Sequence, residues 1–158
     1  MNTKKIIKAL EKWSPHGLCS GTLVEKNGVQ SKTEACAIGC LSLEFLHSKP
    51  GKAWLKKNRH SQKSFIKQYL YGESTTPLHL DKAIEKYFGL SDGGEEDDSD
   101  ACRIMNLNDG VGQDKEQSAN LAIAKSSGLP MSLARKVISL RKQYDKWIEK
   151  QPEEHFDE

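Results

Sequence analysis

The sequence predicts a mainly α-helical fold, in one compact domain of about six helices with at most one short β-hairpin near residues 18–30. Its 158 residues suit a single domain without disulfides, because a chain of this length buries about 68–70% of its unfolded surface. Apolar side chains also recur at helical spacing through most of the chain. We therefore expect one domain over residues 1–158, with an acidic flexible loop at 91–101 and a mobile tail at 152–158.

The first predicted elements are a helix and a hairpin. Ile6, Leu10 and Trp13 are spaced as one face of a helix. Pro15 interrupts that pattern and is expected to end the helix. Two short apolar stretches follow, separated by Asn27-Gly28, a dipeptide typical of hairpin turns. A small hairpin or an irregular loop is expected here.

A helix that is apolar on nearly all sides is predicted next. Ser31-Lys32-Thr33-Glu34 matches a capping box, in which the hydroxyl and the carboxylate each accept from a free backbone amide at the helix start. The run from Ala35 to Leu46 has almost no polar face, so this helix is expected at the centre of the fold. Lys49-Pro50-Gly51 is expected to end it.

Amphipathic helical patterns fill much of the rest of the chain. The expected buried faces are Phe65, Ile66, Tyr69 and Leu70, ended by Gly72; Ile84, Tyr87 and Phe88, between Thr76-Pro77 and Gly89; Leu121 and Ile123, from Asp114 to Gly128; and Leu133, Val137, Leu140, Tyr144 and Trp147. The last set forms a regular seam that packs on another helix or on a partner chain. Self-association through residues 133–147 is therefore one alternative.

Charge is strongly segregated along the chain. Residues 1–72 carry 13 Lys and Arg against 4 Asp and Glu, whereas residues 73–101 carry 2 against 9, although the net charge is only +2. Aromatic residues such as Trp54 and Phe65 lie among the cations, and they suit either nucleic-acid contacts or core positions. A solvated surface is the simpler interpretation of the segment from Lys52 to Lys67, which we call the basic segment. Its candidate anion-binding residues are Lys56, Lys57, Arg59, Lys63 and Lys67.

The cysteines allow three interpretations. Cys19, Cys36, Cys40 and Cys102 suggest a zinc site, but Cys36 and Cys40 lie one turn apart in an apolar helix, where thiols more often pack as core residues. In the second interpretation Cys36 or Cys19 is a nucleophile and His16 its base, because amides at a helix N-terminus favour the thiolate. The third, inert buried thiols, is the simplest. We expect no metal and no cofactor.

Other signals narrow the class of protein. Asn108-Asp109-Gly110 is typical of a turn, with a polar clamp on a ligand as the alternative. Nucleotide-binding loops and zinc-protease or hydrolase signatures are missing from the sequence. Apolar runs are too short for a membrane span, and the early lysines do not suit a signal peptide. We therefore expect a cytoplasmic protein with reduced thiols and no membrane contact.

Three stretches resemble a family of small bacterial and phage domains whose activity is unassigned. The stretches are His16-Gly17-Leu18-Cys19-Ser20-Gly21, Ala35-Cys36-Ala37-Ile38-Gly39-Cys40-Leu41 and Asn108-Asp109. They are similar to the family's Gly-x-Cys-x-Gly, Cys-x-x-Gly-x-Leu and Asn-Asp motifs. Leu18 and Ala35 depart from the family, which tends to have tryptophan there. The resemblance implies a polar ligand pocket formed by Cys19, Gly21, Cys36, Asn108 and Asp109.

We therefore favour a small, non-enzymatic binding or accessory module with this polar pocket and a basic face. One alternative is a thiol-dependent hydrolase or transferase that uses Cys36 or Cys19. Another is a nucleic-acid-binding protein that uses the Lys52–Lys67 face. The expected partners are an anionic ligand, a nucleic acid, another protein or a second copy of the chain.

Overall fold

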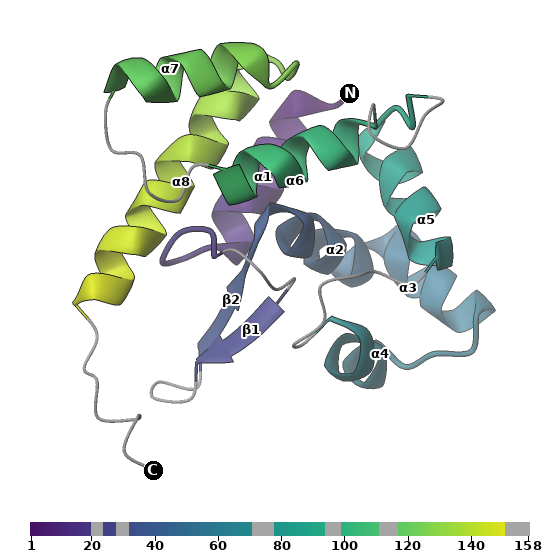
Figure 1. The fold of residues 1–158 in the computed structure, drawn as a ribbon. Coiled ribbons are helices and arrows are strands. Elements are labelled where there is room, and N and C mark those ends of the chain that lie inside the picture. The colour runs from purple at the N-terminus through teal and green to yellow at the C-terminus, as the bar shows by residue number, and fades with distance from the viewer. Residues whose placement is uncertain (20–23, 28–31, 71–77, 94–98, 111–116, 151–158) are drawn as a thin grey trace.

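The computed structural model describes residues 1–19, 24–27, 32–70, 78–93, 99–110 and 117–150. It shows the mainly α-helical fold that the sequence predicts (Figure 1). The elements within these residues are α1 (Thr3–Trp13), β1 (Val24–Asn27), β2 (Lys32–Ala35), α2 (Ala37–His47), α3 (Lys49–Lys57), α4 (Gln62–Tyr69), α5 (Leu78–Phe88), α6 (Asp100–Gly110), α7 (Gln117–Ser126) and α8 (Met131–Glu149). The predicted tail at 152–158 lies outside the described residues.

Helix α1 forms as its apolar spacing predicts. Ile6 and Leu10 are fully buried, and Trp13 packs against the core at the end of the helix. The side chain of Asn2 caps the helix by accepting from the backbone N–H of Lys5 at 3.2 Å. A local side-chain cap therefore accounts for the start of this helix.

The hairpin is present, but it lies slightly later in the chain than expected. Strands β1 and β2 pair antiparallel, with Val24 opposite Ala35 and Asn27 opposite Lys32. The predicted capping box is wrong, because residues 32–35 are extended and pair with β1. Helix α2 therefore begins at Ala37, and its N-cap is Cys36.

Helix α2 is central, as its apolar sequence predicts. It contacts α1, α3, α4, α5 and α6, and Figure 1 shows it in the middle of the molecule. Where α3 begins, a Cβ atom on Gly51 would lie 1.7 Å from the backbone oxygen of Phe45. Only glycine fits at this position, because the contact is with backbone that cannot move aside.

The basic segment forms parts of two helices, α3 and α4, with a break between them. Asn58 and Arg59 leave the helical path, and Arg59 has a φ of 60°. The hydroxyl of Ser61 then accepts from the backbone N–H of Ser64 at 3.3 Å and starts α4. The Ser61 cap therefore explains why a new helix begins after the turn at Asn58 and Arg59.

The predicted turn at Asn108-Asp109-Gly110 is also wrong. These residues form the last turn of α6. Asp100, expected in the acidic loop at 91–101, is instead the first residue of α6, and residues 94–98 lie outside the described residues. The side chain of Asn108 is buried within the fold, so tertiary contacts override its local preference for a turn.

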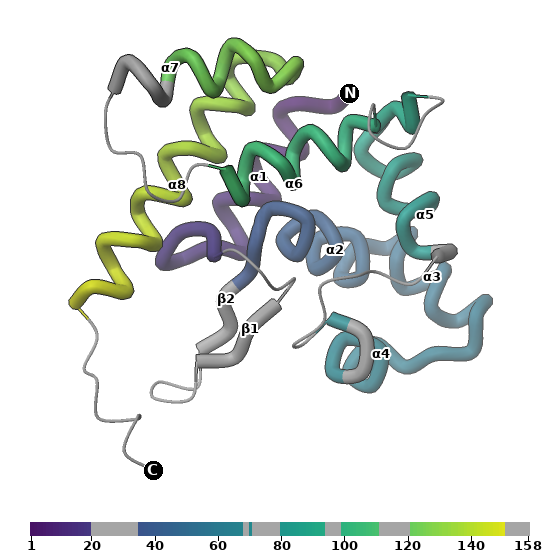
Figure 2. The backbone as a smooth tube through the Cα atoms, viewed as in Figure 1, coloured from purple at the N-terminus to yellow at the C-terminus, as the bar shows by residue number. Residues whose placement is uncertain are grey.

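Helices α7 and α8 form a helical hairpin at one side of the molecule (Figure 2). Helix α8 also packs against α1 and α6. Leu133, Val137 and Leu140 of its predicted seam are buried inside the chain, so the seam packs on helices of the same chain. None of the described helices has the length and apolar character needed to cross a membrane.

Candidate functional site

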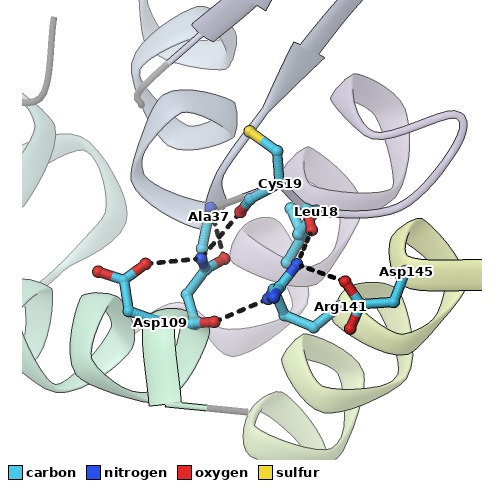
Figure 3. Close-up of polar contacts among 7 residues, drawn as sticks. Leu18, Cys19, Ala37, Asp109, Arg141 and Asp145 are labelled. Atoms are coloured by element: carbon cyan, nitrogen blue, oxygen red, sulfur yellow. Dashed lines mark hydrogen bonds and ion pairs between the residues drawn. The ribbon is translucent and has the colours of Figure 1, made fainter. Parts of the chain in front are cut away.

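The three stretches that carry the motifs meet at one place, which we call the polar junction. It comprises Leu18, Cys19, Ala37, Asn108 and Arg141 (Figure 3). The Asn108 side chain, which is 1% exposed, accepts from the backbone N–H of Ala37 at 3.0 Å. It donates to the backbone oxygen of Cys19 at 3.0 Å. One amide therefore ties the Cys19 segment, the start of α2 and the end of α6 together.

Sequence reasoning missed Arg141, which completes the polar junction. Its Nε donates to the backbone oxygen of Asn108 at 2.9 Å, and one terminal nitrogen donates to that of Leu18 at 2.8 Å. The same nitrogen lies 3.5 Å from Asp145, so the buried charge has a carboxylate partner. A usable signal exists, because Arg141 lies one helical turn after Val137 and so borders the apolar seam.

Gly17 brings the Cys19 segment against α8. Its φ is +100°, and a Cβ atom there would lie 2.3 Å from the backbone oxygen of Leu140 and from the backbone nitrogen of Tyr144. The next amide, that of Leu18, donates to the Leu140 oxygen at 2.9 Å. Both the backbone conformation and the close approach to α8 therefore require glycine.

Cys36 caps α2 through its side chain. Its sulfur accepts from the backbone N–H of Gly39 at 3.4 Å, and its side chain is 7% exposed. Burial raises the pKa of the Cys36 thiol, and this effect outweighs the lowering by the backbone amides of Gly39 and Ile38. The charge of Asp109 raises the pKa further. The amides at the helix start therefore lower the Cys36 pKa as expected, but burial has the larger effect, and the net pKa is raised.

The other thiols differ in burial and belong to no metal-binding group among the described residues. Cys19 and Cys40 are buried, and Cys102 is half-buried. Burial raises the pKa of Cys40 well above its ordinary value, with additions from the charges of Cys36 and Cys19. Among the described residues, no group of three or more His, Cys, Asp and Glu side chains is arranged to hold a metal ion. The zinc interpretation therefore has no geometric support in this part of the chain.

The structure places the remaining predicted site residues as follows. His16 stacks on the Trp147 ring of α8, with ring centroids 4.4 Å apart. Asp109 is exposed and accepts from the side-chain nitrogen of Asn108 at 3.2 Å. Gly21 lies outside the described residues. Since the Asn108 amide is engaged within the chain, the ligand pocket expected beside it stays a prediction.

The basic segment presents its cations to solvent, and its Trp54 and Phe65 rings pack against the core. Phe65 is 2% exposed and meets Trp54 edge-on, with ring centroids 5.5 Å apart. The aromatic residues are therefore core residues, as one interpretation predicts. The exposed cations of the basic segment are Lys52, Lys56 and Lys57 on α3, Arg59 in the turn, and Lys63 and Lys67 on α4.

A second cationic surface, which sequence reasoning missed, lies between α7 and α8. It is a groove of about 780 Å³, which we call the α7–α8 groove. Its apolar lining residues are Leu121, Ala124 and Ile138. Its polar lining residues are Arg135, Ser139, Lys142, Gln143 and Lys146. No periodicity signal predicts such a groove, because it depends on how far apart two neighbouring helices pack.

No protein-family model, curated protein or solved structure matches this chain, so comparison with known proteins does not indicate its function.

Proposed function

We propose that this protein is a non-enzymatic binding module that holds the phosphate backbone of a nucleic acid on its basic segment. The observation that carries the proposal is the exposure of every cation of that segment, with no acidic residue between Phe45 and Gly72. Lys52 and Lys56 share one face of α3, and Lys63 and Lys67 share one face of α4, because each pair is four residues apart.

Phosphate fits this segment better than an acidic protein does. Protein interfaces centre on apolar and aromatic side chains, whereas contacts to nucleic-acid backbones are dominated by Lys and Arg. In the described part of the chain, the exposed large apolar side chains are Met1, Met105, Leu121 and Ile148, and all of them lie outside the basic segment. Since the Trp54 and Phe65 rings pack against the core, we expect them to contribute no base stacking, and we expect little sequence preference.

The proposal is tested by fluorescence anisotropy with a fluorescein-labelled duplex of about 20 base pairs, titrated between about 50 and 200 mM salt. Each phosphate contact contributes about −0.9 to the slope of log K against log salt. The double substitution Lys56→Gln/Lys63→Gln is expected to weaken binding and to reduce the steepness of that slope by about 2.

A matched control comes from the α7–α8 groove. Lys142→Gln/Lys146→Gln removes the same charge from a different surface and is expected to leave the slope unchanged. Undetectable binding of duplex and single-stranded DNA at low salt would contradict the proposal. Equal losses in the two double variants would show that net charge alone controls the binding.

The competing thiol-enzyme function has less support. Cys36 caps α2 through its sulfur, and burial raises its pKa, so little thiolate is present at neutral pH. The residues of the polar junction satisfy backbone groups of the chain itself. Both observations favour a structural use of these residues over a catalytic one.

A further inference from the structure

The α7–α8 groove combines an apolar floor with a cationic rim, unlike the basic segment. Ala124 is 1% exposed and Ile138 is 7% exposed, and with the more exposed Leu121 they form the floor. Arg135, Lys142 and Lys146 are the charged side chains among the described residues that line the groove. An occupant must therefore bring both apolar and anionic groups.

The positions of the three cations indicate the length of the occupant. They lie on one helix, at intervals of seven and four residues. With a rise of 1.5 Å per residue, the cations are spread over about 16 Å along α8. One anionic head group cannot pair with charges this far apart, so a fatty acid or a similar amphiphile leaves part of the rim unpaired. Carboxylates distributed along a chain match the rim.

A nucleic acid does not fit the groove as well as it fits the basic segment. Its backbone has no apolar side to cover the exposed side chain of Leu121, and this apolar surface is what distinguishes the groove from the basic segment. An amphipathic helix supplies both features, because apolar residues at helical spacing face the floor while carboxylates beside them reach the rim.

We infer that the α7–α8 groove is a docking site for an acidic amphipathic helix of a partner protein. The helix lies along α8, where its apolar face covers Leu121, Ala124 and Ile138. Its carboxylates pair with Arg135 and the two lysines of the rim. This surface is separate from the basic segment, so the two partners can be tested independently.

The test measures binding of a fluorescein-labelled designed helix of about 15 residues, with leucines at helical spacing and glutamates beside them, by fluorescence anisotropy. A scrambled peptide of the same composition is the matched control for charge. The designed helix is expected to bind saturably and at least about tenfold more tightly than the scrambled peptide, because only the designed helix has an apolar face.

Two substitutions separate the floor from the rim. Leu121→Ser is expected to weaken the designed helix by about tenfold. Lys142→Gln/Lys146→Gln is expected to weaken it by about fivefold, because two charge pairs at the rim are lost. Lys56→Gln/Lys63→Gln carries the same charge change on the basic segment and is expected to leave peptide binding unchanged. All these side chains are at least partly exposed, so the variants should fold.

Several outcomes overturn the inference. Equal affinity for the scrambled peptide shows that charge alone is recognised. If dodecanoate displaces the designed helix at a concentration below that at which the helix itself binds, the groove is assigned to a small amphiphile. If sedimentation shows a dimer and Leu121→Ser dissociates that dimer, the groove is assigned to a second copy of the chain. If the unsubstituted protein binds DNA but does not bind the designed helix, this inference alone is rejected. If it binds the designed helix but not DNA, only the proposed function is rejected.

Discussion

Replacing Asn108 with alanine tests the polar junction directly. The substitution removes the acceptor of the Ala37 N–H and the donor to the Cys19 oxygen, both within a side chain that is 1% exposed. Each backbone group left without a partner in the interior costs about 1–3 kcal/mol. Two such groups predict a loss of about 2–6 kcal/mol, a large part of the 5–15 kcal/mol typical of a domain.

Urea denaturation followed by far-UV circular dichroism measures this loss as a lower midpoint at an unchanged m value. The matched control is Asn106→Ala, since Asn106 lies on the same helix with an exposed side chain. The control is expected to stay within about 0.5 kcal/mol of the parent protein. A loss below about 1 kcal/mol for Asn108→Ala, or equal losses for the two variants, would refute the bridging role of Asn108.

Two further predictions concern the segments that meet at the polar junction. Gly17→Ala is expected to destabilise the chain by about 2–5 kcal/mol through its positive φ and its clash with the Leu140 backbone, as measured by the same denaturation. Gly110→Ala, with no atom within 4 Å of the added Cβ, is its control and should be close to neutral. Iodoacetamide labelling at neutral pH, mapped by mass spectrometry, should modify the half-buried Cys102 before Cys36, since burial raises the Cys36 pKa. Rapid labelling of Cys36 in the folded protein would instead support the thiol enzyme.

The sequence predicts elements well where local pattern and packing agree. Ile6 and Leu10 form the buried face of α1, and the apolar run that includes Leu41 forms the central helix. Gly89 ends α5 with a φ of +70°, as the glycine stop predicts. In each case the period of the apolar residues matches the face that the fold buries, so no long-range information is needed.

Prediction fails where a distant segment competes with a local signal. Ser31 to Glu34 has the residues of a capping box, but pairing with β1 keeps residues 32–35 extended. Asn108 has a strong turn preference, but its side chain bonds to backbone groups 71 and 89 residues away. Arg141 looks like a surface charge because the two backbone oxygens to which it donates lie on other segments. Local propensities are weak compared with such buried contacts, so sequence alone does not reveal them.

The roles of the motif residues explain why both proposed binding surfaces lie away from the polar junction. Gly17 permits the approach to α8, Cys36 caps α2, and Asn108 joins Cys19 to Ala37, so each acts on the backbone of this chain. A side chain whose polar atoms already satisfy internal groups can bind a ligand only by releasing them, at a cost of about 1–3 kcal/mol for each group. The cations of the basic segment and of the α7–α8 groove face solvent and carry no such cost. Substitution in the polar junction should therefore change stability first and binding only through unfolding, whereas substitution on either surface should change binding at constant stability.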